Sequence, residues 1–217
     1  MTKTAQKNGL RLLLLGASGA VGTQVLKLAI ADDRVAQVVA PSRHALAAAS
    51  PKLKNPVVDF SQIAVDADWL AVNCVVCALG STIREAGSQE AFAFVDRDLP
   101  VRFATLAQQH GAKSFALNSS LGASAKGNFY LRTKAEAEAA IASLGFDSYT
   151  VVRPSLIDAV REKTRPGEAI GLAVARVFKP LIPARYRPVT ALQIARALLN
   201  AAMEGSPGHH VIESEAL

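Results

Sequence analysis

A tyrosine and a lysine four residues apart are the best candidates in this sequence for acid–base chemistry. Tyr130 and Lys134 would lie one turn apart on one face of a helix, and no other tyrosine of the chain is followed by a lysine at this spacing. A tyrosine exchanges protons near neutral pH only if its ordinary pKa of about 10 is lowered, which a nearby ammonium does. The pair is therefore predicted to donate or accept a proton; the alternative is a surface tyrosine beside a lysine by chance.

Two serines precede this pair at the end of an apolar stretch. Residues 114–118 are predicted to form a strand, and Ser119 and Ser120 follow it directly. A hydroxyl at that point could position a substrate carbonyl or alcohol beside the tyrosine. Ser120 is the preferred candidate, and Ser119 is the alternative.

Three glycines at a three-residue spacing predict a nucleotide-binding turn. The apolar run 10–15 ends in Gly16-Ala17-Ser18-Gly19-Ala20-Val21-Gly22, and a helical pattern begins at once. Gly16 suits the turn, Gly19 lets a pyrophosphate approach the backbone, and Gly22 lets the helix pack closely. The free N–H groups and the dipole of the first helical turn favour an anion. A tight turn without a ligand is the alternative.

Other predicted strands end in residues that suit a cofactor, which in a parallel sheet lies outside the carboxyl ends of the strands. After the second strand there is no Asp or Glu to accept from the ribose hydroxyls of NAD; instead Ser42 and Arg43 offer a hydroxyl and a guanidinium to the 2′-phosphate of NADPH. Asp59, in the third strand, would meet the adenine, and Gly80, after the fourth, permits close backbone approach to the cofactor. A solvated surface arginine is the alternative for Arg43.

These residues need a scaffold that alternates strands and helices, and the hydrophobic pattern supplies one. It predicts an α/β fold, a Rossmann-like, doubly wound, mainly parallel sheet with helices on both faces. We expect one NAD(P)-binding domain over residues 1–217, with 155–190 as a small substrate or lid segment. The predicted strands are 10–15, 35–40, 56–60, 69–79, 114–118, 148–152 and 209–213. The predicted helices are 20–31, 88–110 with an interruption at Pro100, 128–144, around 170–178, and 190–203, while 44–49 is a short helix or a loop.

The overall composition excludes several classes of protein. Half of the 217 residues are hydrophobic, so a disordered chain is excluded, and no apolar stretch has the length of a membrane span. Residues 1–9 carry no export signal, so we expect a cytoplasmic protein. The net charge of +6 comes mainly from residues 153–187 and forms no stripe, which suits a cofactor phosphate at least as well as DNA.

Cys74 and Cys77 form a C-x-x-C pair that we do not interpret as a redox or metal site. Residues three apart on a strand face opposite sides of the sheet. No further Cys or His stands at metal-ligand spacing. We therefore expect two small buried hydrophobic residues and no bound metal.

The glycine turn together with Tyr130 and Lys134 resembles the short-chain dehydrogenase/reductases. Residues 79–82, 85–87, 95–98, 118–120, 146–154 and 165–168 resemble their atypical branch, which includes the Tat-interacting oxidoreductase-like proteins, so the resemblance covers nearly the whole chain. It implies that Tyr130 is the proton donor or acceptor and that Lys134 is its partner. It also implies an NADPH site formed by Ser18, Gly19, Ala20, Val21, Ser42, Arg43, Leu79, Gly80, Ile157 and Arg165.

Two departures from the commoner members of that family concern the catalytic residues. The gap between Ser120 and Tyr130 is shorter than in those members, and the helix after the fourth strand has no evident asparagine to complete a proton relay.

These patterns together predict an NADPH-dependent oxidoreductase that reduces a small carbonyl substrate by hydride transfer, with Tyr130 as proton donor. The alternative is a non-catalytic protein whose NADPH occupancy reports redox state to a partner. The presence of both Tyr130 and Lys134 favours the enzyme, because a sensor needs no proton donor. We expect a monomer or a homodimer that binds no nucleic acid.

Overall fold

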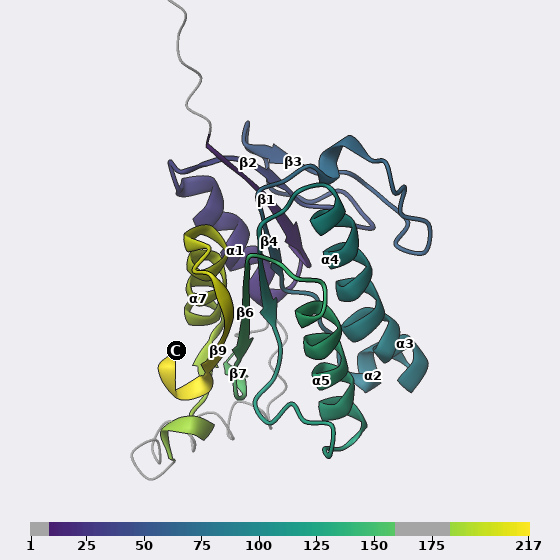
Figure 1. Ribbon diagram of the computed structural model, residues 1–217, viewed down its shortest axis with the longest axis vertical. Coiled ribbons are helices and arrows are strands. Elements are labelled where there is room, and N and C mark those ends of the chain that lie inside the picture. The colour runs from purple at the N-terminus through teal and green to yellow at the C-terminus, as the bar shows by residue number, and fades with distance from the viewer. Residues whose placement is uncertain (1–8, 159–182) are drawn as a thin grey trace, which may run out of the picture.

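A seven-stranded parallel sheet forms the centre of the molecule (Figure 1). The computed structural model describes residues 9–158 and 183–217. The strand order is β3-β2-β1-β4-β5-β6-β9, and every neighbouring pair is parallel. These strands are β1 (Leu10–Leu15), β2 (Val35–Val39), β3 (Leu53–Lys54), β4 (Cys74–Cys77), β5 (Ser114–Asn118), β6 (Ser148–Arg153) and β9 (Gly208–Glu213). A separate small sheet pairs β7 (Ile157–Asp158) with β8 (Val189–Thr190).

Helices cover both faces of this sheet (Figure 1). One face carries α1 (Ala20–Ala31) and α7 (Ala191–Glu204), and the other carries α4 (Leu99–Gln109) and α5 (Phe129–Ala142). The alternation of side chains along β1 explains this arrangement, because Leu12 and Leu14 enter the core on the α1 side while Leu13 and Leu15 enter the core on the α4 side. The predicted doubly wound, Rossmann-like fold is confirmed.

None of the helices within the described ranges combines the length and the apolar character that crossing a membrane requires. The predicted helix around 170–178 and most of the 155–190 segment lie outside the described residues. Residues 44–49 form no helix, and the short helix α2 (Ile83–Ala86) is an addition to the predicted elements.

The third strand lies earlier in the chain than predicted. It is Leu53–Lys54, paired with β2, and not residues 56–60. Pro56 has no N–H to donate to a ladder, and beyond it Val57 makes an isolated bridge without continuing the strand. Asp59 consequently lies in a loop that follows the strand.

The fourth strand is shorter than predicted and carries the two cysteines. A 3-10 turn at Asp68–Leu70 takes the place of the start of the predicted strand. Cys74 belongs to the core on the α1 side and Cys77 to the core on the α4 side. Burial raises the pKa of both thiols to about 12. The two side chains thus lie on opposite faces of the sheet, as expected, and they do not form one site.

The predicted helix 88–110 is divided into three parts. Helix α3 (Gln89–Ala93) is followed by a π-helical turn, Phe94–Asp98, which we call the π-turn, and then by α4. The N–H of Leu99 donates to the carbonyl of Phe94, five residues earlier. Pro100 stands in the first turn of α4, where its ring would clash with the carbonyl four residues before it in a regular α-helix. The wider π-turn relieves this clash.

Candidate functional site

The turn between β1 and α1 is shaped by two of its three glycines. Gly16 has a φ of +81°, a conformation that side chains rarely adopt, and a Cβ there would lie 2.6 Å from the carbonyl oxygen of Ala78. A Cβ on Gly22 would lie 2.0 Å from the carbonyl oxygen of Gly16, so α1 packs directly against the turn. At Gly19 a Cβ would meet its nearest neighbour at 3.4 Å, an ordinary contact. Gly19 is therefore not required by packing and leaves space outside the turn.

The first turn of α1 contains backbone N–H groups that make no hydrogen bond within the described residues. Gly19 caps the helix without a side chain, and the N–H groups of Ala20, Val21 and Gly22 have no partner within the described residues. Ser18, Gly19 and Ala20 are exposed. Free N–H groups at the positive end of a helix bind anions such as phosphates. The residues present therefore fit the pyrophosphate of a dinucleotide.

The loop after β2 offers one uncommitted cation. Arg43 is exposed and makes no hydrogen bond or ion pair with the part of the chain that the structure describes. The Ser42 hydroxyl, in contrast, donates to the carbonyl of His44 at 2.7 Å and accepts from the amide of Asn55 at 2.7 Å. Of the two residues predicted to meet a 2′-phosphate, Arg43 is available, whereas Ser42 already holds its own loop together.

Asp59, predicted to meet the adenine, is exposed and engaged with its own turn. Its carboxylate accepts from the backbone N–H and the hydroxyl of Ser61, both at 2.8 Å. These hydrogen bonds hold the pKa of Asp59 below its ordinary value.

Helix α5 presents Tyr130 and Lys134 on one face. Asn128 caps the helix by accepting from the N–H of Leu131 at 3.0 Å. Tyr130, in the first turn, is half-buried, with its ring centroid 5.3 Å from that of Phe92 on α3. Lys134, one turn later, is buried. The structure thus brings the predicted pair together, with the phenol closer to solvent and the ammonium beneath it.

Lys134 forms a buried ion pair that the sequence analysis did not predict. Its ammonium lies 2.8 Å from Oδ1 of Asp96, and both side chains are almost completely buried. The other oxygen of Asp96 accepts from the backbone N–H and the hydroxyl of Ser81, at 2.9 and 2.7 Å. Burial alone would lower the pKa of Lys134, but the Asp96 carboxylate and the Tyr130 phenol more than offset it, so that the pKa lies above its ordinary value.

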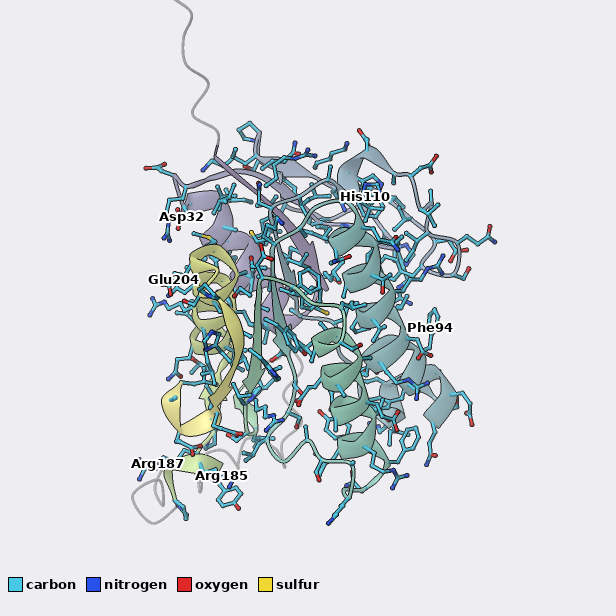
Figure 2. All side chains as sticks on the ribbon, viewed as in Figure 1. Asp32, Phe94, His110, Arg185, Arg187 and Glu204 are labelled. Carbon is cyan, nitrogen blue, oxygen red and sulfur yellow. The ribbon has the colours of Figure 1, made fainter. Side chains whose placement is uncertain are left out.

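The π-turn places Asp96 beside Lys134. Phe94, at the start of the π-turn, projects away from the sheet and is exposed (Figure 2), whereas Asp96 points inward. A signal was present in the sequence, because Asp96 shares helical spacing with the apolar residues Phe92, Leu99 and Phe103. A carboxylate on such an apolar face needs a buried partner.

Gly80 lies beside this ion pair without a side chain to cover it. A Cβ there would lie 3.6 Å from Oδ1 of Asp96 and 3.7 Å from Nζ of Lys134. Gly80 is exposed, and its backbone beside the ion pair is therefore not covered by a side chain of its own.

The two serines after β5 differ in what their hydroxyls do. Ser119 is buried, and its hydroxyl donates to the carboxylate of Glu138, one turn beyond Lys134 on α5. Ser120 is half-buried, and its hydroxyl is 3.4 Å from the carbonyl of Leu121, a weak contact. Ser120 is thus the serine whose hydroxyl is available to a ligand. Just before them, Oδ1 of Asn118 is buried and has no hydrogen-bond partner among the described residues.

Glu138 also fixes the end of β6. Arg153 donates to Glu138 at 2.6 Å and to Glu213 of β9 at 3.1 Å. The ends of β5 and β6 are therefore linked through the Glu138 carboxylate of α5, and Arg153 links β6 to β9. Sequence reasoning missed this network, because its members are far apart in the chain.

The remaining predicted cofactor residues lie at the carboxyl end of the sheet or outside the described ranges. Leu79, after β4, is partly buried against the α4-side core, and Ile157 of β7 packs against the α1-side core. Arg185 and Arg187 lie at this end of the molecule (Figure 2). Arg165 lies outside the described residues. Within those residues no group of three His, Cys, Asp or Glu is arranged to hold a metal ion.

Comparison with known proteins agrees with this geometry. Residues 16–176 match the family model described as NAD(P)H-binding. The chain belongs to this family. It is 34% identical over 215 residues to the rat protein HTATIP2, covering 95% of this chain and 87% of that one. It is 38% identical over 173 residues to the protein fmp52, mitochondrial, of Emericella nidulans, covering 76% of this chain and 72% of the relative. The predicted resemblance to atypical short-chain dehydrogenase/reductases is thereby confirmed.

Solved structures share the fold at low sequence identity. A short-chain dehydrogenase family protein from Francisella tularensis superimposes with a TM-score of 0.71 at 15% identity, covering 96% of this chain and 98% of that one. MoeE5 in complex with UDP-glucose and NAD gives a TM-score of 0.70 at 17% identity, covering 94% of this chain and 75% of that one. The chain thus shares the fold of these proteins.

Proposed function

We propose that this protein is an NADPH-dependent oxidoreductase that reduces a small carbonyl compound, with Tyr130 as the proton donor. The observation that carries the proposal is the arrangement of α5, which presents a half-buried phenol one turn from a buried ammonium. The open N-terminus of α1, which suits a dinucleotide, follows β1 at the same edge of the sheet at which α5 follows β5. An acid and a cofactor site at one edge are what carbonyl reduction requires.

Each residue has a task in this reaction. The N–H groups of Ala20 and Val21 bind phosphate oxygens, and the ammonium of Lys134 orients the cofactor beside Gly80. Bound NADPH supplies the hydride that the carbonyl carbon accepts. The hydroxyl of Ser120 donates a hydrogen bond that positions the carbonyl oxygen, and Tyr130 transfers its phenolic proton to that oxygen. The product is an alcohol.

The preference for NADPH over NADH rests on Arg43. An exposed guanidinium that has no partner among the described residues, on the loop where the adenosine ribose would lie, suits a phosphate dianion. Replacing Arg43 by Ala should weaken NADPH binding much more than NADH binding, measured by fluorescence titration. Equal losses for the two cofactors would refute the assignment.

The catalytic proposal is tested by NADPH consumption with a panel of aldehydes and quinones. Tyr130→Phe keeps the ring that packs on Phe92 and should lower kcat for the best substrate by a factor of about 100 or more, as loss of a positioned acid does. Lys113→Met, at an exposed lysine that precedes β5 at the opposite edge of the sheet, is the control and should behave as wild type. Wild type and Tyr130→Phe that consume NADPH equally slowly on every compound would contradict the proposal.

A second function is favoured by one observation, the engagement of the Lys134 charge with Asp96. A protein that only binds NADPH and signals its occupancy to a partner would use such a pair to build the cofactor site, without a proton transfer. The same panel separates the two functions, because a sensor would bind NADPH with high affinity and consume it with no compound.

A further inference from the structure

The two oxygens of the buried Asp96 carboxylate have different partners. A buried carboxylate could have been paired by backbone donors alone, and Asp96 already accepts two hydrogen bonds from Ser81. Those bonds occupy one oxygen and leave the other directed at Nζ of Lys134. The carboxylate is thus clamped on one side and faces the ammonium on the other.

The lysine has few other charged neighbours. The titratable groups that act on Lys134 within the described residues are Asp96 of the π-turn, Tyr130 of α5 and Cys77 of β4. Burial raises the pKa of the Cys77 thiol to about 12, so this thiol is uncharged at neutral pH. Asp96, at 2.8 Å from the ammonium, is therefore the counter-ion of Lys134.

We propose that Asp96 is a positioning residue, which holds Lys134 protonated and fixed beside Tyr130 and Gly80. A buried lysine without a counter-ion gives up its proton, with its pKa lowered by up to about 3–5 units. A neutral lysine would no longer attract a polar ligand or the phenolate form of Tyr130 as a cation does. The pair joins the π-turn, which carries Asp96, to α5, which carries Lys134.

The pairing is tested by measuring the titration of Lys134 directly. NMR of the isotope-labelled lysine side chains is recorded from pH 6 to 11 for wild type, for Asp96→Asn and for Glu136→Gln. The last variant breaks the exposed pair of Arg97 and Glu136, which joins the same two elements at 2.8 Å. The Lys134 titration should move down by about two units or more in Asp96→Asn and stay in place in Glu136→Gln. An unchanged titration in Asp96→Asn would overturn the proposal.

The positioning role in catalysis rests on the proposed function and has its own readout. The high-pH limit of NADPH-dependent carbonyl reduction should move down in Asp96→Asn by about as much as the Lys134 titration does. A shifted titration with an unshifted pH profile would show that the pair is only structural. If wild type reduces no carbonyl compound at all, the proposed function fails, while the lysine titration still decides whether Asp96 keeps Lys134 charged.

A double variant covers the case in which Asp96→Asn does not fold. The proposal predicts that Lys134→Met restores folding to Asp96→Asn, because it removes the buried amine that is left without its partner. The urea midpoint of Asp96→Asn/Lys134→Met should then lie above that of Asp96→Asn. If the double variant is as unstable as the sum of the two single variants, the two side chains are not coupled and the proposal is wrong.

Discussion

At the scale of single residues, two glycines three positions apart in the first turn meet different demands. Gly22 faces the protein, where a Cβ would meet the carbonyl oxygen of Gly16 at 2.0 Å. Gly19 faces outward, where a Cβ would be tolerated by the protein itself. Gly22 is needed for folding, and we infer that Gly19 is needed for the ligand.

Alanine substitutions separate these two demands. Gly22→Ala should destabilise the fold by about 3 kcal/mol or more, because backbone atoms must move to admit the methyl group. Gly19→Ala should leave the free energy of unfolding nearly unchanged but weaken NADPH binding at least tenfold, because the methyl group points at the pyrophosphate. Urea unfolding and fluorescence titration measure the two effects. Tight NADPH binding by Gly19→Ala would contradict the assignment.

The buried thiols predict how stability depends on alkaline pH. In the unfolded chain Cys74 and Cys77 ionise near pH 8.5, whereas in the folded protein burial raises their pKa to about 12. The folded state therefore binds more protons above pH 8.5, and stability should fall as the pH rises from there, by up to about 1.4 kcal/mol per pH unit for each thiol. Chemical denaturation at pH 8 and pH 10 measures the fall. Cys74→Ala/Cys77→Ala should lose less stability over this range, and parallel losses would show that the thiols are not responsible.

At the scale of elements, α5 connects the site to the sheet. Tyr130, Lys134 and Glu138 follow one another at four-residue spacing, so that they lie on successive turns of one face. The first is half-exposed and the other two are buried, each in an ion pair. The helix that carries Tyr130 is thus attached to the π-turn through Lys134 and to β6 through Glu138.

The deeper contact can be tested through Arg153. Arg153→Met leaves the buried carboxylate of Glu138 without its cation. Because the arginine is partly exposed, the expected loss in the free energy of unfolding is at the lower end of the range for a buried pair, about 3 kcal/mol. Lys113→Met is the matched control. It breaks the exposed pair with Asp147, at 3.5 Å, and should change stability by less than about 0.5 kcal/mol. Equal effects in urea unfolding would show that the network does not stabilise the ends of the strands.

The order of the elements could be predicted from the sequence, because apolar strands and helical periods are local patterns. The third strand was misplaced because residues 56–60 have the local composition of a strand. The proline at their start cannot donate to a ladder, and the segment that pairs with β2 is Leu53–Lys54. The Tyr130–Lys134 pair could be predicted because its spacing lies within one helix. The apolar helical face on which Asp96 stands indicated a buried carboxylate, but the partners of Asp96 and Glu138 could not be predicted, because they are distant in sequence.

At the scale of the whole molecule, a parallel sheet gathers the ends of its strands at one edge. The glycine turn after β1, Arg43 after β2, Gly80 after β4 and Ser120 after β5 follow strands that end there. Residues more than a hundred positions apart are thus brought to one edge without any long connection. The topology, more than any single motif, makes a dinucleotide the ligand that this edge suits.

The most direct test is a crystal structure of the protein grown with excess NADPH. The pyrophosphate should lie within hydrogen-bond distance of the N–H groups of Ala20 and Val21, with the nicotinamide end beside Gly80, Lys134 and the phenol of Tyr130. A structure in which the cofactor avoids the N-terminus of α1, or in which Tyr130 points away from the nicotinamide, would contradict the account.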